Sequence, residues 1–336
     1  MMKKRWLIGG SGSTGSSLLK NILSRHSMIF AGSETSLFCK KPLFDHFTKN
    51  KWRIPYRFPF GLRNEGYHQY NGLDLFYPEY RHSRKSIDQL INRSQTFHEF
   101  CDGFFTLPME ALQKDIWIEK TPGNAWNFDV FLETFPDAGV IHMIRDPLAT
   151  LLSLVRRGFN PVYATGVCLL NHLAALKVEN HPAYIRIKYE DLIKEPVHCI
   201  NGLTQNMGIT FEEQMLVATN PLQIKDTRIP SWHHDEMEDI AHKSTEDQLR
   251  KDNESIQELL ACMRHLQPGP VYAQKHQLNS TTTAGLSVHL GYNVLASSIQ
   301  KDCRGRIKNM ILTERIKRAS RAYANSLIHF PLEWHD

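Results

Sequence analysis

The fold is decided by residues 5–23, which read RWLIGGSGSTGSSLLKNIL. Residues 5–8 predict a short strand, the glycines and serines of 9–17 predict a loop, and the apolar spacing of 18–23 predicts a helix. A glycine loop at the start of a helix offers backbone N–H groups and the positive end of the helix dipole, which suit phosphate or sulfate oxygens. The stretch therefore predicts an anion-binding loop.

The same alternation of strand and helix continues along the chain. We expect strands at 28–31, 116–118, 139–144 and 184–187, and helices at 126–135 and 148–157. Strands that alternate with helices and end in polar loops indicate a three-layer α/β domain around a central parallel sheet. The predicted fold class is therefore α/β and P-loop-like, with a helical cap insertion and a C-terminal helical extension.

Two regions depart from this alternation. Residues 38–105 hold 16 of the 34 aromatic residues, so we interpret 38–115 as a helical cap inserted in an α/β domain that spans 1–265. We expect these aromatics to build a small core, the alternative being that some also shape an acceptor pocket. Residues 266–336 are interpreted as a linker, loop-like at 267–270, followed by a basic amphipathic helix.

Taken alone, the glycine loop fits three kinds of site. Gly10 to Gly15 match the GxGxxG pattern of a dinucleotide-binding Rossmann domain, with Glu34 near the place of its ribose-binding acid. The loop also approaches a Walker A motif, but Ser16 stands where the phosphate-binding lysine belongs, which disfavours an ATP or GTP phosphotransferase. The third possibility is a hydroxyl-rich loop for a 5′-phosphosulfate.

Motifs in the second half of the chain distinguish these possibilities. Arg145 ends a predicted strand and Ser153 follows eight residues later, so a guanidinium and a hydroxyl can converge on one phosphate. Lys120-Thr121-Pro122 precedes this pair and Tyr189-Glu190-Asp191-Leu192 follows it. In this order and spacing, residues 5–235 resemble the sulfotransferases that use 3′-phosphoadenosine 5′-phosphosulfate (PAPS), and look closest to their bacterial and tyrosylprotein-type branch.

The resemblance implies PAPS as cofactor, adenosine 3′,5′-bisphosphate as product, and no metal. The residues implied to bind the cofactor are Gly12, Ser13, Thr14, Gly15, Ser16, Ser17, Arg145, Ser153, Arg157 and Tyr189. The loop residues would hold the 5′-phosphosulfate, the two arginines and Ser153 the 3′-phosphate, and Tyr189 the adenine. As catalytic residues it implies Glu34 as general base and Lys120 beside the transferring sulfuryl group.

The glycine loop departs from the family pattern at one position. Most relatives carry arginine or lysine where this chain has Ser13. The change removes a cation expected beside the sulfuryl group and puts catalysis in doubt. We expect Lys120 to carry the role alone, with Lys40 or Lys41 from the start of the cap as alternatives.

Composition limits the classes of partner. The chain has a net charge of +5, and residues 301–321 alone hold eight basic and two acidic side chains. The rest of the chain is therefore close to neutral, and no nucleic-acid binding is expected. This basic segment is expected to face solvent or contact another copy of the chain. The alternative is that it binds peripherally to a membrane surface. Six cysteines without a CxxC pair, no signal peptide and no long apolar run indicate a cytoplasmic protein.

These observations predict a sulfotransferase that acts on a hydroxyl of a carbohydrate or small-molecule acceptor. A protein tyrosine is disfavoured as acceptor because secretory signals are missing. Two alternatives stay open. One is a non-catalytic nucleotide-binding protein of sulfotransferase ancestry, suggested by Ser13. The other is a Rossmann-type NAD(P) oxidoreductase, which would have no use for Arg145 paired with Ser153.

Overall fold

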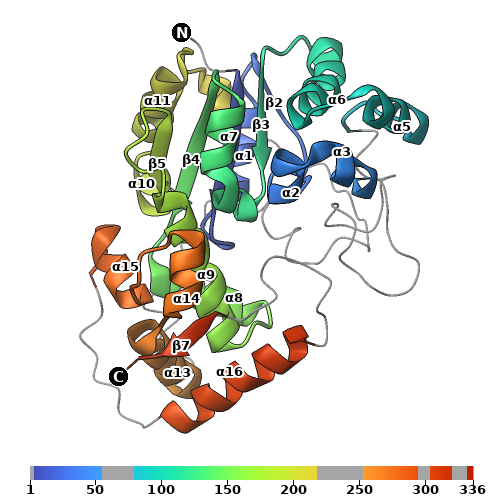
Figure 1. The fold of residues 1–336 in the computed structure, drawn as a ribbon. Coiled ribbons are helices and arrows are strands. Elements are labelled where there is room, and N and C mark those ends of the chain that lie inside the picture. Colours follow the sequence, from blue (N-terminus) through green and yellow to red (C-terminus); the bar gives the residue numbers. More distant parts are fainter. Residues whose placement is uncertain (1–3, 55–78, 218–252, 294–302, 320–330, 336) are drawn as a thin grey trace.

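A parallel sheet forms the centre of the molecule (Figure 1). The computed structural model describes residues 4–54, 79–217, 253–293, 303–319 and 331–335. Its five strands are β1 (Arg5–Gly10), β2 (Ile29–Ala31), β3 (Ile116–Lys120), β4 (Ala138–Ile144) and β5 (Tyr184–Lys188). They lie in the order β2-β3-β1-β4-β5, and every pairing is parallel. The predicted α/β class with a central parallel sheet is confirmed.

The strand order distinguishes this sheet from that of a Rossmann domain. In the Rossmann order 3-2-1-4-5 the second strand pairs with the first. Here β3 lies between them, because β1 pairs with β3 from Arg5↔Trp117 to Ile8↔Lys120 and β2 pairs with β3 on its other side. The Rossmann alternative is therefore wrong, and so is the ribose-binding role that it would give Glu34.

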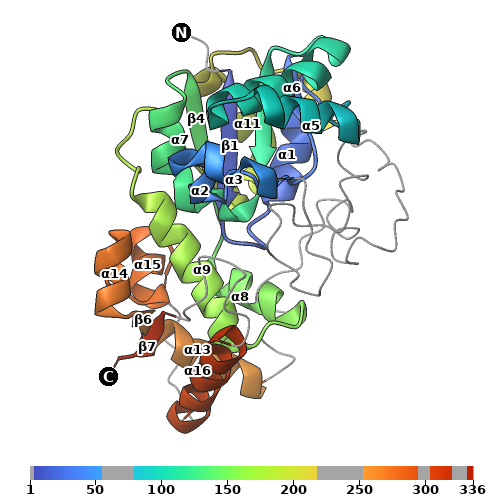
Figure 2. The same cartoon turned by 45° about the vertical axis from the view of Figure 1, so that its right-hand side comes forward.

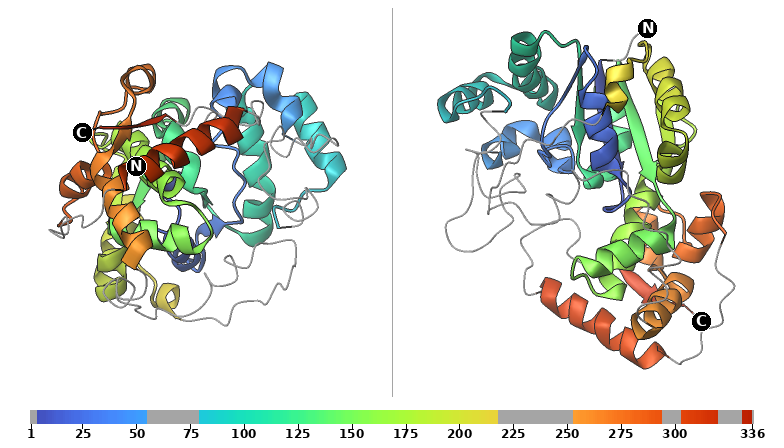
Figure 3. Two further views of the ribbon diagram at one scale, coloured as in Figure 1. Left: turned by 90° about the horizontal axis from the view of Figure 1, so that it is seen from below. Right: turned by 180° about the vertical axis from the view of Figure 1, so that it is seen from behind.

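One face of the sheet is covered by α1 (Ser16–Ser24), α10 (Tyr189–Lys194) and α11 (Pro196–Met207) (Figure 3, right). Successive strand residues point to opposite faces, so Trp6 and Ile8 point to this side and Leu7 to the other. Apolar residues of α1 recur at helical spacing and pack on these strand residues. A short 3-10 helix, Glu213–Leu216, ends this layer.

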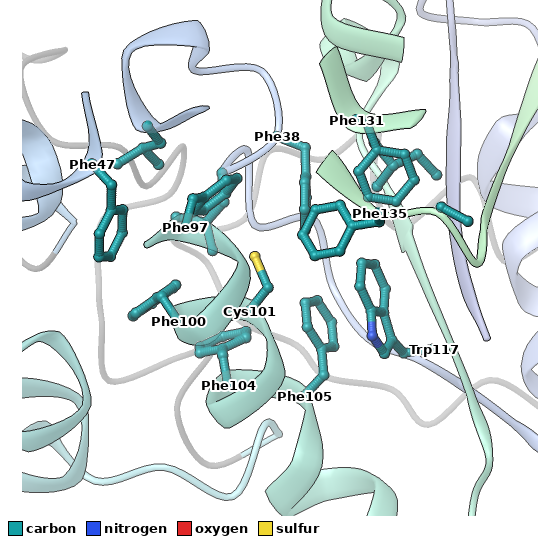
Figure 4. Close-up of a cluster of buried hydrophobic side chains, with 14 of the residues drawn as sticks. Phe38, Phe47, Phe97, Phe100, Cys101, Phe104, Phe105, Trp117, Phe131 and Phe135 are labelled. Carbon is teal, nitrogen blue, oxygen red and sulfur yellow. The ribbon is translucent and has the colours of Figure 1, made fainter. Parts of the chain in front are cut away.

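The opposite face is covered by the predicted cap together with α7 (Phe128–Thr134). The cap is helical as expected, with α2 (Lys41–Asp45), α3 (Phe47–Asn50), a 3-10 turn (Lys51–Arg53), α5 (Arg84–Arg93) and α6 (Phe97–Leu112). Phe105 stacks on Trp117 of β3 with ring centroids 4.0 Å apart, and Phe38 lies on the same indole at 5.5 Å (Figure 4). The described cap aromatics therefore form a core that is continuous with the sheet.

This core agrees with the expectation that the cap aromatics pack together, but it does not test whether some of them line an acceptor pocket. Each labelled aromatic in Figure 4 belongs to one buried cluster, so these rings favour a packing role over a pocket-lining role. Seven of the aromatic residues fall in 55–78, outside the described ranges. An acceptor pocket lined by those seven stays a prediction.

A helical layer at the carboxyl end of the sheet joins the two halves of the chain (Figure 2). It starts with a 3-10 helix (Pro122–Asn127), α8 (Pro147–Arg156) and α9 (Pro161–Leu176). No expected element corresponds to α9. Nearly every residue of this helix is buried, so it lacks the polar face by which a helix is recognised in sequence. None of the described helices combines the length and apolar character needed to cross a bilayer.

The described residues from 253 onward form a C-terminal unit packed on α9 (Figure 2). Its elements are α13 (Asn253–His265), β6 (Leu266–Pro268), α14 (Pro270–His276), α15 (Thr283–His289), α16 (Arg304–Ala319) and β7 (Leu332–Trp334). The predicted basic helix is present as α16, with Ile307 and Ile311 buried. The structure differs from the linker interpretation of 267–270, because β6 pairs there with β7.

Candidate active site

The glycine loop between β1 and α1 follows a path that few residue types allow. Gly10 has φ +139°, and a Cβ there would lie 2.4 Å from the carbonyl oxygen of Met143. Gly15 has φ +83° and occupies the N-cap position of α1, while Ser13 has φ +66°. Left-handed backbone favours glycine, so the three positions together turn the chain tightly at the end of β1.

Hydrogen-bonding groups of this loop are left available to an anion. The hydroxyl of Ser13 is buried and has no hydrogen-bond partner among the described residues. No side chain caps α1, so its first N–H groups are also available. Buried unpaired donors are costly, and anionic oxygens bound in the loop would satisfy them. The residues present therefore fit a sulfate or phosphate group.

The two predicted catalytic residues meet beside the loop. Lys120 ends β3 and Glu34 follows β2, and these neighbouring parallel strands bring both side chains to the same end of the sheet. Lys120 Nζ forms an ion pair with Glu34 Oε1 and donates a hydrogen bond to Ser17 Oγ at 2.7 Å. Lys120 is 4% exposed and Glu34 8%. A cation, a carboxylate and a loop hydroxyl thus share one buried position.

Glu119 holds this arrangement together, and the sequence analysis did not identify it. Its Oε1 accepts hydrogen bonds from Thr35 N at 2.8 Å and from Thr121 Oγ1 at 2.7 Å. Its Oε2 accepts one from Asn124 Nδ2. Complete burial raises the pKa of the Glu119 carboxyl. Glu119 fastens the segment that carries Glu34 to the strand that carries Lys120, and the signal was a carboxylate inside the apolar run of β3.

Arg145 and Tyr189 lie on the other side of the loop. Arg145 Nη1 donates a hydrogen bond to the carbonyl oxygen of Ser13 at 3.2 Å, and its guanidinium carbon lies 4.6 Å from the centre of the Tyr189 ring. The Tyr189 ring also borders Gly15, where a Cβ would come within 2.3 Å of it. The ends of β4 and β5 thus bring a cation and an aromatic ring against the loop, in a favourable cation–π pair.

The remaining predicted residues lie along α8. Asp146 caps this helix, accepting a hydrogen bond from Ala149 N at 2.8 Å. Ser153 and Arg157 are half-buried on its last turn and at its C-cap. A Cβ on Gly12 would lie 3.5 Å from Leu154 of the same helix, so α8 runs beside the loop. The grouping of Ser153 and Arg157 with Arg145 stays a prediction.

The lysines considered as substitutes for the missing loop cation differ in position. Lys41 is exposed and forms an ion pair with Asp45 at 2.6 Å. Burial, together with the neighbouring Arg53, lowers the pKa of Lys40. Lys120 is the lysine for which the structure shows a contact with a loop side chain. This geometry favours Lys120 for the role of the missing cation.

A second buried polar cluster borders the base of the loop. His142 Nε2 lies 2.7 Å from His172 Nδ1, and His142 Nδ1 lies 2.6 Å from the Tyr184 hydroxyl. Burial lowers the pKa of His172 to about 4 and that of His142 well below its ordinary value. Both imidazoles are therefore neutral at pH 7. Across the described ranges, no three His, Cys, Asp or Glu side chains form a group that could bind a metal ion.

With this geometry in view, the chain can be compared with known proteins. A model of the sulfotransferase family matches residues 7–213. The match covers more than half of the chain and includes every predicted site residue. No curated protein is similar enough to this sequence to count as a match.

Several solved structures resemble the chain weakly. The sulfotransferase domain of the Synechococcus PCC 7002 olefin synthase shares 17% identity, over 87% of this chain and 95% of that one, with a TM-score of 0.49. The sulfotransferase domain of the curacin biosynthetic pathway shares 17%, over 88% and 99%, with a TM-score of 0.46. Sulfotransferase STF9 from Mycobacterium avium shares 12%, over 64% and 66%, with a TM-score of 0.37. At these identities and TM-scores the similarities carry no argument about this chain.

Proposed function

The chain belongs to the sulfotransferase family, and from this we propose that it transfers the sulfuryl group of PAPS to a hydroxyl of a carbohydrate or small-molecule acceptor. The observation that supports this most directly is the meeting of Lys120 and Glu34 with Ser17 of the glycine loop. The three groups come from the ends of two strands and the start of a helix, and together they combine a cation and a base with an anion-binding loop.

The residues that would hold PAPS surround this point. The buried hydroxyl of Ser13 and the uncapped N–H groups of α1 suit the oxygens of the 5′-phosphosulfate. Arg145 would bind the 3′-phosphate and the Tyr189 ring the adenine. Bound there, PAPS supplies an activated sulfuryl group and a stable leaving group, adenosine 3′,5′-bisphosphate.

The catalytic work of the protein is to position groups and to move one proton. Because Oε1 of Glu34 is paired with Lys120, its Oε2 is the atom that would take the proton of the acceptor hydroxyl as the new O–S bond forms and the bond to the leaving group breaks. The Lys120 ammonium would stabilise the negative charge that develops on the leaving oxygen. Charge neutralisation and in-line positioning are what such transfers require.

The burial of Glu34 favours a slender acceptor. Glu34 is 8% exposed, and Lys120 of β3, with which it pairs, is 4% exposed. A hydroxyl on a sugar or on another small molecule can be presented to such a group more easily than a side chain on a folded protein surface. This supports the proposed acceptor class.

The cofactor assignment is tested by calorimetric titration with adenosine 3′,5′-bisphosphate, with adenosine 5′-monophosphate and NADP as comparators. We expect micromolar binding that depends on the 3′-phosphate. Arg145→Ala should weaken binding of the bisphosphate by about tenfold or more, and that of the monophosphate far less, because a charge-assisted contact is lost. Equal weakening of both ligands would contradict the role of Arg145, and a preference for NADP would contradict the function.

Labelled PAPS then separates an enzyme from a binding protein. A panel of sugars, phenols and aliphatic alcohols is screened for transfer of the label. Transfer to any of them supports catalysis despite Ser13. Tight nucleotide binding without transfer to any acceptor would favour the non-catalytic alternative, for which the missing loop cation is the specific reason.

A further inference from the structure

A turn from the C-terminal unit lies against the end of β5. Gly291, with φ +78°, directs the chain so that Tyr292 reaches the residues on either side of Tyr189. The Tyr292 hydroxyl donates a hydrogen bond to Glu190 Oε2 at 2.7 Å. On the other side, Lys188 Nζ lies 4.9 Å from the centre of the Tyr292 ring. Tyr292 therefore holds both chain neighbours of Tyr189.

Glu190 carries this contact to the end of β4. Its second oxygen, Oε1, accepts a hydrogen bond from the backbone N–H of Asp146 at 2.9 Å. Asp146 follows Arg145 directly and caps α8. One carboxylate thus connects Tyr292 to both strand ends that carry the Arg145 and Tyr189 pair.

The Tyr292 hydroxyl is suited to a permanent donor role. Burial and the adjacent Glu190 carboxylate raise the pKa of Tyr292 well above its ordinary value, so the hydroxyl keeps its proton at any physiological pH. Tyr292 also lies beyond residues 7–213, the part of the chain that the family model matches. Tyr292 therefore acts from the C-terminal unit and not from the segment that the family model matches.

We propose that Tyr292 is a positioning residue for the nucleotide: through Glu190 it fixes the relative orientation of Tyr189 and Arg145, so that the C-terminal unit completes the nucleotide site. The inference rests on the proposed function. It assigns the C-terminal unit a part in binding the adenosine bisphosphate moiety shared by PAPS and its product. Loss of the Tyr292 hydroxyl would leave the Glu190 carboxylate free to turn and would loosen both strand ends.

The test is Tyr292→Phe, which keeps the ring over Lys188 and removes only the hydroxyl. We expect the Kd for adenosine 3′,5′-bisphosphate to rise about fivefold to tenfold, because the lost hydrogen bond lies within the protein and only part of its effect reaches the ligand. The KM for PAPS should rise by a similar factor while kcat stays within about twofold, because the catalytic groups lie on the other side of the loop.

Two further variants distinguish positioning from general stability. Tyr272→Phe removes a hydroxyl from another half-buried tyrosine of the same unit, whose ring packs on Trp126 and His276, and it should leave the Kd unchanged. In a double-mutant cycle, Tyr292→Phe should add little to Glu190→Gln if the two residues act as one unit. Additive effects, or an equal loss with Tyr272→Phe, would overturn the proposal.

The outcomes also separate this inference from the function on which it rests. If wild-type protein binds the bisphosphate and folded Tyr292→Phe binds it equally well, the inference fails and the proposed function stands. If wild-type protein does not bind the bisphosphate, both fail together. Near-ultraviolet circular dichroism establishes that each variant is folded.

Discussion

Lys120 is the residue on which most of the proposed chemistry depends. A buried ion pair such as that of Lys120 with Glu34 adds little net stability, because removing two charges from water offsets their attraction. Such a pair is nevertheless held firmly when hydrogen bonds fix both partners. Ser17 does this for the lysine, and Thr35 does it for the segment of Glu34 through Glu119. The pair is therefore better explained by function than by stability.

Replacement of Lys120 by alanine should lower kcat by about two orders of magnitude, the usual effect of removing one positioned donor from a reaction that develops negative charge. The Kd for adenosine 3′,5′-bisphosphate should change much less. Turnover with labelled PAPS and a confirmed acceptor gives the first quantity, and calorimetry gives the second. Near wild-type turnover would remove Lys120 from the mechanism.

Lys41→Ala serves as the matched control for Lys120→Ala. It removes another lysine of the site region, but one that is exposed and paired with Asp45. We expect turnover to stay within about twofold of wild type, since surface ion pairs contribute little. A large loss with Lys41→Ala would instead show that this lysine substitutes for the missing loop cation.

Among the elements, the glycine loop and the first turn of α1 act as one unit. Gly15 has a left-handed backbone and lies in close contact with Tyr189, so there are two separate reasons why this position requires glycine. Gly158, after α8, has a similar φ of +88°, but no atom lies within 4 Å of a Cβ placed there. The two glycines therefore share a positive φ and differ in their surroundings.

Gly15→Ala and Gly158→Ala form a matched pair. Gly158→Ala should lose about 1 to 2 kcal/mol of stability, the cost of a left-handed alanine, and Gly15→Ala should lose more because its methyl group also meets the Tyr189 ring, both measured by urea unfolding. Only Gly15→Ala should also weaken nucleotide binding, because the new methyl group displaces the Tyr189 ring. Equal nucleotide affinity in the two variants would mean that Tyr189 does not contribute to the site.

At the scale of the whole molecule, α9 connects the sheet to the C-terminal unit. One part of this helix carries His172 to the sheet residue His142, and the apolar residues Leu169 and Leu173 pack against the C-terminal unit. The histidines are completely buried and neutral, and burial lowers the pKa of both. The contact between β4 and α9 is therefore sensitive to acid.

The sign of this effect follows from the pKa of His172, about 4 in the folded protein. A histidine in the unfolded chain has a pKa near 6.5, so below that pH the unfolded chain binds a proton that the folded protein does not. The free energy of unfolding therefore decreases as the pH is lowered from about 6.5 to about 4. When the pH is lowered from roughly 7 to 5, His172 alone should lower the free energy of unfolding by about 2 kcal/mol, as measured by urea denaturation.

His172→Gln should remove this contribution and flatten the pH dependence of unfolding. An unchanged slope in His172→Gln would show that the buried imidazole does not control the acid sensitivity.

Local patterns in the sequence were sufficient for the five strands of the central sheet and for the glycine loop, whereas the roles of Glu34, Lys120, Arg145 and Tyr189 are implied by the resemblance to the sulfotransferases and stay predictions. Strand period, glycine spacing and charged residues at strand ends are properties of short segments, so they can be recognised without the fold. The uniformly buried α9 and the turn-like residues of β6 lack such a pattern, and neither was predicted.

The tertiary structure alone decided which of these residues meet. Glu34 and Lys120 are 86 positions apart, and they form a pair because β2 and β3 are neighbours in a sheet whose order no single segment encodes. Packing likewise gave Glu119 its role and brought Tyr292 to Glu190 from 102 positions away. The physical reason is that contacts between distant segments depend on how the layers pack. The sequence of one short segment does not specify which distant segment it will contact.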